Sequence, residues 1–208
     1  KFTDKNFFSD NYKNIPCVKK IFSIINERRK FFDYQIYINS DLKLDSNFNK
    51  LLKYTDTIDD NFFISGIRLN VDKKNTGELI PSSFQHWGTD YFIFSLPINI
   101  CKQPFLLGRY FWDVHILTNV FNFSKNHSCK LFDASFIFRP LHINHNYSWG
   151  KKENKTNNVS LISRQIFYNQ KLSSPFENIC IKAFQKILIY RDDGTIDFKI
   201  GNKKRFFI

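Results

Sequence analysis

Short runs in which apolar and polar residues alternate constrain the fold of this chain most strongly. A period of two is typical of a strand that buries one of its faces. Four segments show it, at residues 34–39, 67–71, 111–121 and 132–138. A fifth apolar run, at 91–100, is continuous and contains Pro97, which predicts a buried strand that ends or bulges there. The sequence therefore predicts a sheet of several short strands.

The last strands predicted are a hairpin. Residues 187–190 and 196–200 are apolar and flank Arg191-Asp192-Asp193-Gly194, and an Asp-Gly pair favours a tight turn. The segment 190–193 also matches the metal-binding YxDD core of reverse transcriptases. That match covers four residues only, and an ordinary turn rich in Asp and Gly is the interpretation we favour.

Three helices are predicted around these strands. Residues 15–30 carry apolar side chains at helical spacing, with Pro16 near the start. Residues 46–55 form a shorter pattern, with Ser46 as the expected cap. Residues 174–187 begin with Ser174-Pro175-Phe176-Glu177, a capping box with proline at the first helical position.

These elements together predict an α+β fold. We expect a mainly antiparallel sheet with an N-terminal helix, a short second helix, and a C-terminal helix followed by the hairpin. We also expect a single domain over residues 1–208, with an exposed loop near 147–158, which is polar and charged. No apolar run approaches the roughly 18 residues that a membrane-spanning helix needs.

The charge balance is strongly basic. The chain has 31 Lys and Arg against 19 Asp and Glu, a formal net charge of +12. Phe, Lys, Asn and Ile are abundant while Gly and Pro number only 7 and 6, which suggests an AT-rich genome and a lysine content raised by codon usage. Glu also has an A-rich codon and yet is scarce, so codon usage does not explain the deficit of acids. The excess of cations favours an anionic partner.

The cations occur in clusters, the last of which, Lys203-Lys204-Arg205, precedes Phe206 and Phe207. Our functional hypothesis is based on this pattern. Phosphates are bound by several cations on one surface, and aromatic rings stack on unpaired bases. We expect a non-enzymatic domain that binds RNA or DNA or belongs to a ribonucleoprotein-like assembly. The predicted nucleic-acid-binding residues are Lys19, Lys20, Arg28, Arg29, Lys30, Lys203, Lys204 and Arg205.

Two alternatives remain open. The chain could be a structural or interaction subunit of a larger bacterial, viral or organellar machine, with its Phe-rich surface buried against protein neighbours. The other alternative is a metal-dependent nuclease. Its candidate ligands, imidazole and carboxylate groups, are Asp113, His115, His142 and His145. A strand would place Asp113 and His115 on one face but would point His142 and His145 to opposite faces, so we predict that they do not converge on a metal.

No cofactor-binding or catalytic motif is found. The chain has neither GxGxxG nor GxxxxGK[ST], and no GxSxG elbow, so we predict no cofactor and assign no catalytic residue from the sequence. The cysteines are Cys17, Cys101, Cys129 and Cys180, with no CxxC pair. We expect them to be small buried residues in a reducing intracellular compartment rather than disulfides, because a domain of this length does not need such cross-links.

Overall fold

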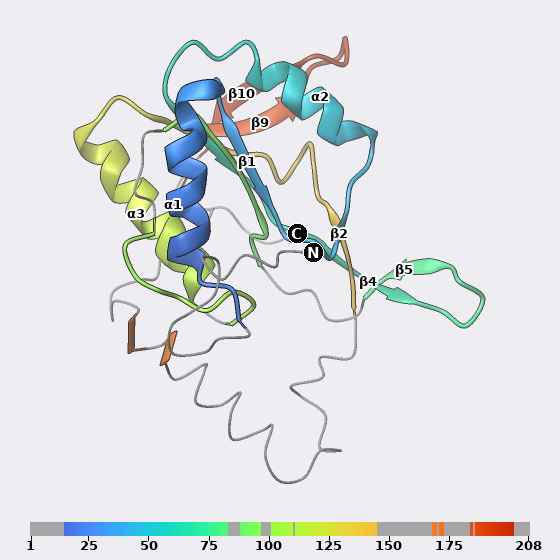
Figure 1. The fold of residues 1–208 in the computed structure, drawn as a ribbon. Helices are drawn as coiled ribbons and strands as arrows, with labels where there is room; N and C mark the ends of the chain where they lie inside the picture. Colours follow the sequence, from blue (N-terminus) through green and yellow to red (C-terminus); the bar gives the residue numbers. More distant parts are fainter. Residues whose placement is uncertain are drawn as a thin grey trace, which may run out of the picture. The chain divides into compact units, whose positions relative to one another are not determined.

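The computed structural model describes residues 15–82, 88–96, 101–109, 111–144, 168–169, 171–172, 184 and 186–201 (Figure 1). These residues belong to two compact units. The first unit takes its described residues from 15–33, 101–120 and the short pieces near 170, and the second unit from 34–96, 121–144 and 184–201. The expectation of one domain stays a prediction.

The first unit contains the predicted N-terminal helix. Helix α1 spans Val18–Arg28 and continues into a 3₁₀ turn, η2, at Arg29–Phe31, so the prediction at 15–30 is confirmed. Val18 and Phe22 are its buried residues. The N–H group of Val18, at the start of the helix, has no acceptor within the helix and donates to the Phe105 carbonyl at 2.8 Å. Leu107 in turn donates to the carbonyl of Pro16 at 2.9 Å. The extended residues around 105–107 therefore fix the start of the helix.

Residues 111–121 are helical, and the prediction of a strand there was wrong. Helix α3 spans Trp112–Asn126, and its last residues belong to the second unit. Trp112, Ile116 and Val120 are buried at a spacing of four, which fits both a period of two and a helical period. Val114, which a strand would bury beside them, is only partly buried.

The second unit contains a six-stranded mixed sheet in the order β1-β6-β3-β7-β9-β10. Neighbours pair antiparallel except for β3 with β7 and β7 with β9, which are parallel. The strands are β1 (Gln35–Ile38), β3 (Phe62–Ser65), β6 (Tyr91–Phe94), β7 (Lys130–Asp133), β9 (Lys186–Tyr190) and β10 (Ile196–Ile200).

A four-stranded sheet of order β2-β8-β4-β5 completes this unit. Its strands are β2 (Leu42–Lys43), β4 (Leu69–Lys73), β5 (Leu79–Pro81) and β8 (Leu141–Ile143). β4 pairs with β8 in parallel, and the other two pairs are antiparallel. The chain is thus α+β as predicted, and the expected antiparallel pairing is correct only in part.

Helix α2 (Ser46–Thr55) covers one face of the six-stranded sheet, and Figure 1 shows it over β9 and β10. The short second helix is therefore confirmed, but Ser46 is not its cap. Asp45 is the N-cap, and its carboxylate accepts from the Asn47 N–H at 2.9 Å. Asp45 lies one residue earlier and has the extended backbone that a cap requires.

The core of the second unit lies between α2 and this sheet. Phe48 and Leu51 of α2 pack there against side chains from the four central strands and from the segment after β7. These sheet and loop residues are Phe62, Ile64, Tyr91, Ile93, Phe132, Ala134, Ile137, Phe138 and Leu188. β3 and β6 are buried throughout, which is why each reads as a continuous apolar run.

The alternating pattern at 132–138 is a strand only at its beginning. β7 ends at Asp133, whose carboxylate accepts from the Ser135 N–H at 2.9 Å and turns the chain. Phe136 is consequently 57% exposed, whereas Phe138 returns to the core. The strand predicted over this segment is therefore too long.

The predicted hairpin is confirmed as β9 and β10. Gly194 has φ 79° in its turn, a conformation that glycine adopts without strain. The capping box at 174–177 and the loop at 147–158 lie outside the described residues. Phe184 is buried but not helical, and Lys186 and Ile187 belong to β9, so the helix predicted over 174–187 is wrong at its C-terminal end. No helix within the described ranges is both long and apolar enough to cross a membrane.

Candidate functional site

Three of the predicted cations lie together at one place, the C-terminal end of α1. Arg28 ends the helix, and Arg29 and Lys30 follow in η2. Arg28 and Lys30 are exposed, and Arg29 is partly buried. Positive charge at this end is favoured by the helix dipole, because the last carbonyl groups of a helix carry partial negative charge. Within the described residues, none of the three cations forms an ion pair with a carboxylate.

Two aromatic rings follow these cations directly. Phe31 is 69% exposed and Phe32 is 63% exposed. The ammonium group of Lys30 lies 5.0 Å from the centre of the Phe31 ring, within the range of a cation–π interaction. Arg28–Phe32, which we call the basic-aromatic segment, thus combines three cations with two solvent-facing rings.

The other predicted nucleic-acid-binding residues do not join this segment within the described structure. Lys19 and Lys20 lie in the first turn of α1, and nine residues separate Lys19 from Arg28, or about 13 Å along a helix. Lys203, Lys204 and Arg205 lie outside the described residues. The prediction from sequence grouped all these cations as one kind of site. Helix α1 separates Lys19 and Lys20 from Arg28, Arg29 and Lys30.

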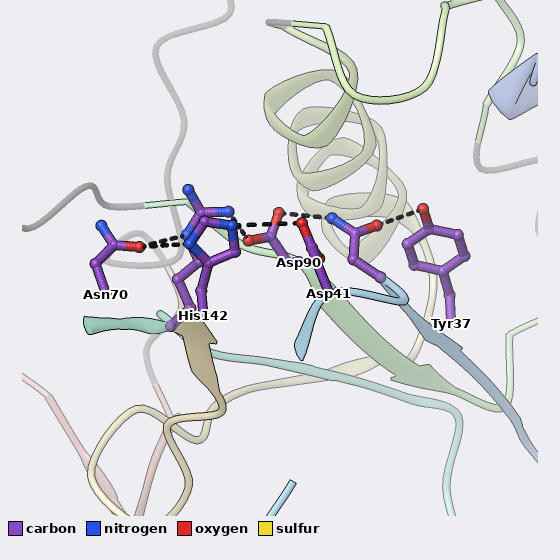
Figure 2. Close-up of polar contacts among 7 residues, drawn as sticks. Tyr37, Asp41, Asn70, Asp90 and His142 are labelled. Carbon is purple, nitrogen blue, oxygen red and sulfur yellow. Dashed lines mark hydrogen bonds and ion pairs between the residues drawn. The ribbon is translucent and has the colours of Figure 1, made fainter. Parts of the chain in front are cut away.

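The second unit contains a buried polar network that the sequence did not reveal (Figure 2). Its centre is the ion pair between Arg68 and Asp90, whose side chains are 10% and 8% exposed. The Asp90 carboxylate also accepts from Asn39 Nδ2 at 2.9 Å. Tyr37 donates its hydroxyl to Asn39 Oδ1 at 2.7 Å and extends the network onto β1.

His142 of β8 joins the network from the four-stranded sheet. Asn70 Oδ1 accepts from Arg68 Nε at 3.0 Å and lies 3.1 Å from His142 Nδ1. Because this oxygen can only accept, Nδ1 of His142 is the donor. The other ring nitrogen, Nε2, faces a carboxylate oxygen of Asp41 at 3.3 Å. Both nitrogens of the buried imidazole are therefore engaged.

Burial dominates the electrostatics of this network. It raises the pKa of the Asp90 carboxyl above its ordinary value, and Asp41 adds to the rise. The Arg68 guanidinium, and more weakly His142, oppose it by favouring the charged form. The contacts of the network join residues before and on β4 and β8 of the four-stranded sheet with residues at the ends of β1 and β6 of the six-stranded sheet, so the network links the two sheets.

Comparisons with known proteins identify no relative. No protein family, no curated protein and no solved structure matches the chain.

The candidate ligands for a nuclease that the structure describes lie on two different elements, α3 and β8. Asp113 and His115 lie on α3, two positions apart. In a helix this spacing separates their side chains by about 200° around the axis, so they do not share a face. His115 Nε2 accepts from Asn119 Nδ2 at 2.8 Å, and His142 belongs to the network above. His145 lies outside the described residues. In the part of the chain that the structure describes, no three His, Cys, Asp or Glu side chains are grouped as a metal site.

The Asp residues of the hairpin turn have structural contacts. Asp193 accepts from the Thr195 N–H at 2.9 Å and from its hydroxyl at 2.6 Å, and both bonds lower the pKa of Asp193. Asp192 follows Arg191 in the same exposed turn. These contacts are those of an ordinary turn.

The cysteines that the structure describes are thiols. Cys17 and Cys101 are buried, and Cys129 is partly buried. Burial raises the pKa of Cys129 to about 12, so its thiolate is scarce at neutral pH and the group is unsuited to nucleophilic attack. Cys180 lies outside the described residues.

Proposed function

We propose that this chain is a non-enzymatic protein that binds single-stranded nucleic acid through the basic-aromatic segment, Arg28–Phe32. One observation carries the proposal: three cations directly precede two phenylalanine rings that are 69% and 63% exposed. Large apolar side chains are normally buried in a core or against a partner, so two adjacent rings with this exposure suggest a binding surface. The neighbouring cations favour an anionic partner.

The chemistry of a single strand suits both kinds of side chain. Its phosphates attract Arg28, Arg29 and Lys30, and neutralising each phosphate releases counterions. Its unpaired bases can stack on Phe31 and Phe32, which a duplex would not allow without unstacking. Contacts of this kind read the backbone and the face of any base, so we expect little sequence preference.

The test is fluorescence anisotropy of a labelled single-stranded RNA, measured with the full chain at low and at near-physiological salt. We expect binding whose logarithmic affinity falls linearly with the logarithm of salt concentration, by about 0.7 for each neutralised phosphate. Reversing the charge of Arg28, Arg29 and Lys30 to Glu should weaken binding and flatten this salt dependence equally for different oligonucleotide sequences. A labelled DNA duplex serves as the comparison.

The matched control reverses three exposed lysines elsewhere, Lys43, Lys53 and Lys73, and so changes the net charge by the same amount. If binding depends only on overall charge, both triple variants will weaken it equally, and the proposed site is wrong. Replacing Phe31 and Phe32 by Ala should cost about 1 to 3 kcal/mol of binding free energy for each stacked base. If neither nucleic acid is retained at low salt, the proposal fails and the protein-assembly hypothesis replaces it.

A further inference from the structure

The open edge of β10 is complementary to itself. β10 is the last strand of the six-stranded sheet, and in the described part of the chain no strand pairs with its outer side (Figure 1). Its sequence, Ile196-Asp197-Phe198-Lys199-Ile200, places opposite charges symmetrically about Phe198 and matching apolar residues outside them. We propose that two copies of this chain dimerise by antiparallel pairing of β10 with β10, centred on Phe198.

The backbone hydrogen bonds fit this register. Arg191 N–H donates to the Thr195 carbonyl at 2.8 Å, so these residues form a hydrogen-bonded pair next to the turn. Such pairs alternate along an antiparallel ladder, and Asp197 and Lys199 therefore direct their N–H and C=O groups toward β9. The same groups of Ile196, Phe198 and Ile200 point to the open edge. In antiparallel pairing centred on Phe198, the outward N–H and C=O groups of one copy would therefore form hydrogen bonds with the outward C=O and N–H groups of the other.

The side chains fit the same register. Asp197 of one copy would lie opposite Lys199 of the other at non-hydrogen-bonded positions, where side chains approach most closely. On the opposite face of the sheet, Phe198 would meet its own copy and Ile196 would meet Ile200. Ile200 is 76% exposed and Phe198 is 38% exposed, so the pairing would remove apolar surface from water.

Two of the features that usually block such pairing are missing from this edge. Proteins protect edge strands with proline, with bulges or with charged side chains, lysine above all. β10 has no proline and pairs with β9 without a bulge in the described register. It does carry Lys199, but in the proposed register this lysine meets Asp197 of the other copy instead of a like charge. A two-fold interface of this kind is closed, so it yields a dimer rather than a fibre.

The experiment measures the mass of the full chain by light scattering and sedimentation over a wide range of protein concentration. Wild type should shift from monomer to dimer as concentration rises. Lys199→Asp places like charges opposite each other and should raise the dissociation constant about tenfold or more, since two close charge pairs change sign. The double variant Asp197→Lys with Lys199→Asp should recover most of the dimerisation, because the swap restores the opposite pairs across the interface. It does not recover the ion pair that Asp197 forms with Arg191 in its own hairpin.

Two further variants complete the test, and circular dichroism verifies that each is folded. Lys73→Asp makes the same charge change on an exposed residue of another sheet and should leave dimerisation unchanged. Ile200→Pro removes an outward N–H without affecting the ladder with β9 and should weaken the dimer. A wild type that stays monomeric, a Lys199→Asp variant that still dimerises, or a double swap that does not recover would each overturn the proposal.

Discussion

Two buried polar sites in the second unit differ in how completely their hydrogen bonds are formed. In the network of Arg68, Asp90, Asn70 and His142, every side chain has a polar partner. On β1, the side-chain amide of Gln35 is equally buried, but neither Nε2 nor Oε1 has a hydrogen-bond partner among the residues that the structure describes. Because an unpaired buried polar group loses its hydration without compensation, the first site holds the fold together and the second weakens it.

The largest effect is expected from breaking the network at its centre. Arg68→Met leaves the Asp90 carboxylate buried without its cation and should lower the free energy of unfolding by about 3 to 5 kcal/mol. Chemical denaturation monitored by circular dichroism measures this loss. The control is the double variant Arg68→Met with Asp90→Leu, which removes both charges and should be clearly more stable than the single variant. Equal stabilities would mean that the ion pair does not anchor the network.

A gain in stability is expected at the second site. Gln35→Leu replaces the unpaired amide by an apolar side chain of similar size and should raise the free energy of unfolding by about 1 to 3 kcal/mol. The same denaturation experiment applies. Gln35→Glu is the matched comparison, since it introduces a charge at the same buried position and should destabilise. If Gln35→Leu also destabilises, the amide must have a partner, and the contrast with the network disappears.

A smaller effect is expected where a polar contact is formed but exposed. Asp45→Ala removes the acceptor for the Asn47 N–H at the start of α2 and should cost about 0.5 to 2 kcal/mol. Ser46→Ala, one residue later, should change stability little, because Ser46 already lies inside the helix. Thermal unfolding of the two variants separates them. A larger loss for Ser46→Ala would restore the cap predicted from the sequence.

The sequence predicted those elements whose pattern has one structural solution. The N-terminal helix, α2 and the β9–β10 hairpin have apolar spacing or turn residues that fit no other element. Residues 112–120 fit two solutions, because buried positions four residues apart satisfy both a strand and a helix. Parallel pairing of β3 with β7 was not predictable, since a buried apolar strand shows no preference for the direction of its neighbours.

The candidate sites show the same division. The basic-aromatic segment is continuous in the sequence, and the prediction grouped its three cations before the structure showed the exposed rings beside them. The network joins Arg68, Asp90 and His142, which are far apart in the chain. In the sequence, Arg68 and Asp90 are single polar residues near apolar strands, and His142 was considered only as a candidate metal ligand. A site assembled from distant strands depends on their pairing, and the sequence did not determine that pairing.

The strand order of the six-stranded sheet has a consequence for the time course of folding. β6 pairs with both β1 and β3, and β7 pairs with the other side of β3. The strands near residues 35 and 63 therefore cannot form these pairs until the residues near 93 and 131 have been synthesised. Among the described strands of this sheet, only β9 and β10 pair locally. A chain leaving the ribosome from its N-terminal end must therefore carry the apolar strand β3 without a partner until much later residues have been synthesised. Until then, the apolar residues 62–65 of the nascent chain can be shielded from water only by contacts other than those of the finished sheet.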